Sequence, residues 1–101
     1  MSNAREINQM QRYTMWSVFR RTEIVDEALA GAALTAIARS TEGDDLKIRG
    51  WYDVAGLRAD ADVMVWWHAP DYTTLQTAYH ALRASDLGRT LEPVWSQLAI
   101  H

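Results

Sequence analysis

The sequence contains no cysteine, and this absence removes several kinds of chemistry at once. Disulfide scaffolds, zinc fingers, thiolate catalysis and cysteine-ligated iron–sulfur clusters all depend on cysteine side chains. Glycine-rich phosphate motifs are absent too, because Gly50, Gly56 and Gly88 are isolated and match neither a P-loop nor a dinucleotide fingerprint. Nothing in the sequence therefore requires an oxidising compartment or indicates a nucleotide cofactor.

An excess of basic charge and a long apolar run are missing as well. Ten basic residues stand against thirteen acidic ones, and no stretch gathers lysine or arginine on one face. We therefore expect neither nucleic acid nor an anionic membrane as a partner. The longest apolar runs are far too short to cross a bilayer, and the polar N-terminus lacks the apolar stretch of a secretory signal. The expected location is the cytoplasm.

The sequence does have enough apolar residues for one folded domain. Hydrophobic residues make up 49% of the 101 residues and charged residues 23%, which excludes a disordered tail and predicts a globular domain. Residues 1–11 are expected to form a flexible N-terminal segment. Residues 12–101 carry the periodic patterns and are expected to form the single domain.

The first half of this domain predicts two strands with a helix between them. Tyr13–Arg20 is rich in aromatic and β-branched residues and predicts a strand that is apolar on both sides. A helix is predicted from an N-cap at Thr22 to about Ser40, because acidic residues fill its first turn. Its apolar residues recur at helical spacing: Val25, Leu29, Ala33, Ala36 and Ile37. Leu46–Val54 alternates, with its even positions apolar, and predicts a half-buried strand.

The second half predicts a strand, a helix and a final strand. Asp62–His68 has almost no polar face, and its short connection predicts antiparallel pairing with the strand before it. Pro70 ends that strand, and Asp71 is the predicted N-cap of a second helix. The apolar stripe of this helix is Leu75, Ala78, Tyr79 and Leu82. The alternation of Val94–His101 predicts the fourth strand.

The resulting order, β-α-β-β-α-β, predicts an α+β fold of the ferredoxin-like kind, typical of the dimeric α/β-barrel superfamily. Two helices then cover one face of a four-stranded antiparallel sheet, and the other face is left without a cover. We expect the apolar strand at 63–68 to lie inside the sheet, because an apolar edge strand invites aggregation. We also expect the bare face to pair with a partner sheet in a homo-oligomer.

The residue types that most often carry chemistry form no recognisable site. The five tryptophans are expected to pack the strands rather than line a ligand pocket: Trp16, Trp51, Trp66, Trp67 and Trp95. The histidines lack metal-pair spacing and are expected at surfaces or edges: His68, His80 and His101. The acidic pairs Asp44–Asp45 and Asp60–Asp62 suit turns. Arg49 and Arg58 are expected to be solvated rather than to grip a carboxylate. We therefore assign no catalytic, cofactor-binding or metal-binding residue.

Three segments resemble the chlorite dismutase family. They are RYTMWSVF at 12–19, RGWYDVAGLRADADVMVW at 49–66 and LGRTLEPVWS at 87–96. More narrowly, they are similar to the actinobacterial coproheme decarboxylases, which make haem by oxidatively removing two propionate carboxyls from iron coproporphyrin III with peroxide. The resemblance extends over nearly the whole chain after Arg12.

The resemblance implies that this chain is only the first of two ferredoxin-like halves. The haem or iron coproporphyrin III, its histidine ligand and the distal catalytic residues belong to the second half, so no cofactor and no activity are expected in this chain alone. The missing C-terminal, haem-binding half is then its partner. Two alternatives remain open: a stand-alone dimeric barrel domain that binds a small ligand, and a small monooxygenase of antibiotic biosynthesis or haem degradation.

Overall fold

The structure is a computed structural model that describes residues 12–24 and 26–100. It contains these elements in order: β1 (Tyr13–Arg21), α2 (Glu27–Ser40), β2 (Lys47–Asp53), β3 (Val63–Ala69), α3 (Tyr72–Ala84), the short 3-10 helix η1 (Gly88–Thr90) and β4 (Leu91–Ile100). The predictions for the segment 1–11, Val25 and His101 lie outside the described residues. The β-α-β-β-α-β order predicted from the sequence is confirmed.

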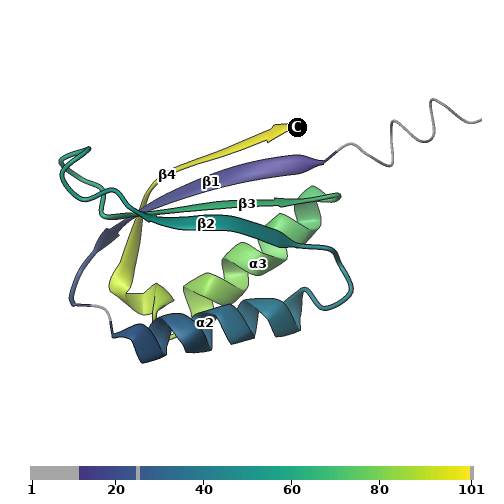
Figure 1. The fold of residues 1–101 in the computed structure, drawn as a ribbon, viewed down its shortest axis with the longest axis horizontal. Helices are drawn as coiled ribbons and strands as arrows, with labels where there is room; N and C mark the ends of the chain where they lie inside the picture. Colours follow the sequence, from purple (N-terminus) through teal and green to yellow (C-terminus); the bar gives the residue numbers. More distant parts are fainter. Residues whose placement is uncertain (1–11, 25, 101) are drawn as a thin grey trace, which may run out of the picture.

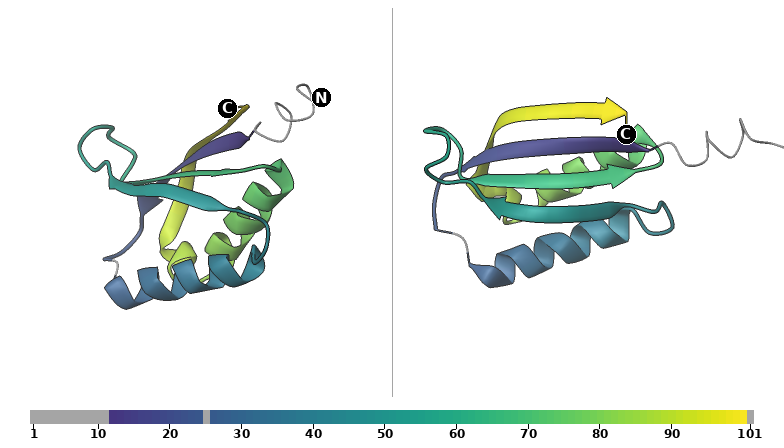
Figure 2. Two further views of the ribbon diagram at one scale, coloured as in Figure 1. Left: turned by 45° about the vertical axis from the view of Figure 1, so that its right-hand side comes forward. Right: turned by 45° about the horizontal axis from the view of Figure 1, so that its top comes forward.

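The molecule has two layers, with α2 and α3 on the same face of the sheet (Figure 1). The sheet is antiparallel with the order β2-β3-β1-β4, so β3 lies inside it as predicted. Figure 2 shows both helices on that one side, and no described element covers the opposite face. The described helices include none that is long and apolar enough to cross a membrane.

The core fills the space between the sheet and the two helices. Its largest fully buried side chains include Phe19, Trp67, Leu75 and Leu82. The Trp67 indole N–H donates to Ser17 Oγ at 3.2 Å, which satisfies the polar atom that this large ring brings into the core. Trp67 therefore stabilises the sheet from the helix side.

The first helix begins later than the sequence predicted. Asp26, not Thr22, is the N-cap, and its side chain accepts from the backbone N–H of Ala28 at 3.0 Å. Thr22 instead donates its backbone N–H and its hydroxyl to the carbonyl oxygen of Thr90. The pairing between β1 and the start of β4 therefore continues through the predicted cap. In the second helix the Asp71 cap is confirmed.

Two β-bulges change the faces and ends of strands. In β2 the register shifts between Ile48 and Gly50, so Trp51 packs against the core and Tyr52 turns to the opposite face. The predicted alternation, with every even position on the core side, is wrong beyond this bulge. A second bulge lets β4 begin at Leu91 rather than Val94 and include Pro93. Proline is tolerated there because β4 is an edge strand.

Candidate functional site

The uncovered face of the sheet, called the open face below, is rich in aromatic side chains. Its residues alternate along the strands with those of the core: Thr14, Trp16, Val18, Tyr52, Met64, Trp66, His68, Trp95, Gln97 and Ala99. Trp95 and Tyr52 are 43% and 39% exposed. Large apolar groups gathered on one face of a small domain mark an interaction surface.

Two stacked indoles form the centre of the open face. The rings of Trp16 and Trp66 lie 6.5 Å apart at 16°, and the Arg49 guanidinium lies 5.6 Å from the Trp66 ring centroid. The Trp66 indole N–H donates to Thr14 Oγ1 at 2.9 Å. Arg49 is therefore held by a cation–π contact across β2 and β3, and the indole polar atom is satisfied before any partner binds.

The five tryptophans therefore do not line a shared ligand pocket. Trp67 lies in the core and Trp51 packs against it from β2, whereas Trp16, Trp66 and Trp95 lie on the open face. This distribution agrees with the predicted role of these residues in strand packing.

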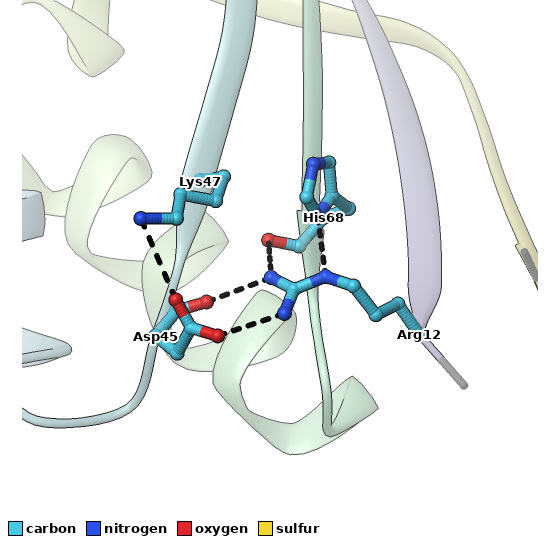
Figure 3. Close-up of polar contacts among 4 residues, drawn as sticks. All are labelled: Arg12, Asp45, Lys47 and His68. Atoms are coloured by element: carbon cyan, nitrogen blue, oxygen red, sulfur yellow. Dashed lines mark hydrogen bonds and ion pairs between the residues drawn. The ribbon is translucent and has the colours of Figure 1, made fainter. Parts of the chain in front are cut away.

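A polar cluster closes one end of the sheet (Figure 3). Arg12 donates from Nε to His68 Nδ1 at 2.7 Å, from Nη1 to Asp45 Oδ2 at 2.8 Å and from Nη2 to the Asp45 carbonyl at 2.9 Å. Lys47 Nζ lies 3.6 Å from Asp45 Oδ1. The cluster therefore ties the start of β1 to β3 and to the loop before β2. The sequence carries no local signal for this cluster, because the partners of Arg12 lie 33 and 56 residues away along the chain.

The contacts of this cluster lower the pKa of Asp45. The hydrogen bond from Arg12 holds the pKa of Asp45 below its usual 3.8, and the charges of Arg12 and Lys47 act in the same direction. A carboxyl whose folded pKa is lowered adds stability above its unfolded pKa, and this stability is lost as the pH falls through the folded value. In the variant Arg12→Met we expect the pKa of Asp45 to rise towards 3.8. The measurement is a pH titration that follows the ¹³C chemical shift of the Asp45 carboxyl carbon.

Asp60 supplies the internal control for that titration. The hydrogen bond from Arg58 lowers the pKa of Asp60 in the same way, and Arg12→Met leaves this pair untouched. The Asp60 midpoint should therefore stay low. An unchanged Asp45 midpoint in the variant would show that Arg12 does not bind this carboxylate.

Most of the remaining charged candidates have structural partners. Arg58 pairs with Asp60 in the β2–β3 loop, and Arg49 lies over Trp66. Asp62 Oδ2 accepts from the backbone N–H of Arg21 at 2.8 Å, which fixes the far end of that loop to β1. The structure does not bring these side chains together around a cavity.

The histidines that the structure describes, His68 and His80, are the side chains to test as ligands of a haem iron. His68 Nδ1 already accepts from Arg12 Nε, so in the neutral ring the other nitrogen carries the proton and has no lone pair for iron. His80 lies on the exposed side of α3 beside a groove and makes no hydrogen bond with a described residue. Histidine ligands of metals are normally oriented by such a bond from the second ring nitrogen. Neither imidazole is prepared to hold iron.

The chlorite dismutase family profile matches residues 10–101. The chain is 40% identical to the coproheme decarboxylase of Mycolicibacterium smegmatis over 94% of this chain and 43% of that protein. It therefore spans less than half of the length of this relative.

Solved structures share the fold. Chlorite dismutase from Candidatus Nitrospira defluvii in complex with imidazole has a TM-score of 0.71 at 19% identity, over 88% of this chain and 39% of that one. A mutant of that enzyme in complex with cyanide gives 0.71 at 18% identity, over 99% and 44%. The family match, the curated relative and the fold agree, and the chain belongs to the chlorite dismutase family.

Proposed function

We propose that this chain is the N-terminal half of a coproheme decarboxylase and serves as its structural, non-catalytic half. The observation that carries the proposal is the alignment with the mycobacterial enzyme, which includes 94% of this chain but 43% of the relative. The iron-binding and catalytic groups then lie in a separate C-terminal half. The lack of a prepared iron ligand at His68 and His80 supports this division.

The open face is the surface that this half offers to its partner. Trp16, Trp66 and Trp95 expose apolar area there, while their strands are braced by hydrogen bonds and ring stacking. Such a prearranged surface loses little conformational entropy when it is buried. Sheet-on-sheet packing with the haem-bearing half would cover these side chains at about 10 Å between the sheets.

The proposal predicts that the chain alone does not convert coproheme. The reaction needs an iron ligand and distal groups around the porphyrin, and a site without them loses both positioning and electrostatic stabilisation. Coproheme and peroxide should give no more decarboxylated product with the chain than without protein, as followed by chromatography. Weak stacking of the macrocycle on exposed indoles is compatible with this result.

Complementation with a C-terminal half tests whether activity returns when both halves are present. Co-expression with the C-terminal part of the mycobacterial enzyme should restore decarboxylation, whereas that part expressed alone should be less active. Turnover by this chain alone, with a histidine-ligated spectrum, would instead favour the small monooxygenase alternative and overturn the proposal.

Isolated chains should also associate with one another. When the haem-bearing half is absent, a second copy is the available sheet that can cover the open face. An interface burying about 1,200–2,000 Å² in total would be of ordinary size for a specific complex. Sedimentation velocity at micromolar concentration should show at least a dimer, and a clean monomer would contradict the role given to this face.

A further inference from the structure

A groove on the helix side of the sheet lies apart from the open face. It has a volume of about 320 Å³, at the lower end of the range for small-molecule sites. Its walls are apolar and come from α2, β2, β3, the residue before η1 and the start of β4: Ala30, Leu34, Trp51, Val63, Leu87 and Leu91. Arg21, the last residue of β1, completes the lining.

The composition of α2 explains why space remains there. The helix packs chiefly against α3, and it places the short side chains of Ala30 and Ala33 on its inner side. Leu34 stays 38% exposed beside the groove instead of filling it. Alanine at these positions leaves the indole of Trp51 and the side chain of Val63 without a bulky partner from the helix.

Two polar groups of the lining lack partners among the described residues. The Trp51 Nε1–H is buried and finds no hydrogen-bond acceptor in the described part of the chain. A buried donor in this state is unfavourable, and an acceptor that reached it would relieve the cost. The exposed Arg21 guanidinium makes no ion pair with any described residue, whereas the neighbouring Arg20 pairs with Glu92. The groove therefore has apolar walls, with a solvent-exposed cation on one of its lining residues and a buried N–H donor without an acceptor on another.

We propose that this groove binds a small apolar monocarboxylate, such as a medium-chain fatty acid. The hydrocarbon part lies against Leu34, Val63 and Leu91, and the carboxylate faces Arg21. A carboxylate has two oxygens, so one pairs with the guanidinium while the other accepts from the Trp51 N–H after the indole turns towards it. A neutral apolar ligand would leave both groups unused.

Octanoate and 1-octanol, which have equally long chains, separate the charged interaction from apolar binding. In ¹H–¹⁵N spectra of the full 101-residue chain, octanoate should shift one indole N–H signal downfield and saturate at millimolar concentration. Trp51→Phe should remove that signal. Arg21→Gln should weaken octanoate binding about fivefold, as expected for an exposed ion pair, and leave octanol binding unchanged. Arg20→Gln is the matched control and should bind octanoate like the parent chain.

Filling the groove tests its location independently of Trp51. Ala30→Leu adds volume to one wall, and it should abolish octanoate binding while the other indole signals keep their positions. The proposal is overturned if octanoate does not saturate, if octanol binds as well as octanoate, or if Arg21→Gln has no effect. Each result is read on the binding signal and is independent of coproheme turnover.

Discussion

Val65→Asp should leave the chain unfolded at 25 °C, whereas Met64→Asp, one residue earlier in β3, should leave it folded. Val65 is fully buried between the sheet and the helices. An unpaired carboxylate in such a site costs several kcal/mol, which is comparable with the whole stability of a small domain, about 5–10 kcal/mol. Met64 lies on the open face, where a carboxylate can reach water. Circular dichroism and thermal denaturation provide the comparison.

The same pair of variants separates folding from association. Met64→Asp places a charge on the open face, beside Val18 and Tyr52. If that face packs against another sheet, the charge becomes buried and unpaired on association. Met64→Asp should therefore sediment as a folded monomer. Unfolding of Met64→Asp to the same extent as Val65→Asp would contradict the assignment of this side chain to an uncovered face.

Alternation and helical spacing predicted the order of elements because each depends on neighbours close in the sequence. The stripe of Leu75, Ala78 and Leu82 is buried as predicted, and the apolar strand around Val65 lies inside the sheet. The errors lie at ends and bulges. Thr22 resembles an N-cap locally, but its pairing with Thr90 depends on a residue 68 positions away. Cross-strand register of this kind leaves no local signal in the sequence.

Some features of the candidate site could likewise be predicted from the sequence, and others could not. The sequence predicted that a bare apolar sheet face would exist, and the structure has one. It did not predict which indoles face it, because the bulge after Ile48 moves Trp51 to the core side and Tyr52 to the open face. The Arg12 cluster and the groove beside Trp51 each join segments that are distant in the chain. Only the folded arrangement brings them together.

Gly88→Ala should destabilise the domain strongly, and Gly31→Ala should stabilise it. A Cβ at Gly88 would overlap the carbonyl oxygen of Leu82 and lie 2.8 Å from the Cα of Arg83. Both are backbone atoms of α3, so neither can rotate away. Relief requires η1 to move, and η1 is flanked by Leu87 and Leu91, which are 4% and 3% exposed. The strain would therefore spread into the core at the start of β4.

The expected loss for Gly88→Ala is about 3 kcal/mol, at the upper end of the usual range for overpacking. For a domain of this size, it corresponds to a fall in Tm of about 12–24 °C. Gly31 lies exposed in the middle of α2, and a Cβ added there would meet nothing within 4 Å, so alanine should add about 0.5–1 kcal/mol through helix propensity. Thermal and urea denaturation of the two variants should give effects of opposite sign. A loss below about 1 kcal/mol for Gly88→Ala would mean that η1 does not pack against the end of α3 as closely as the structure has it.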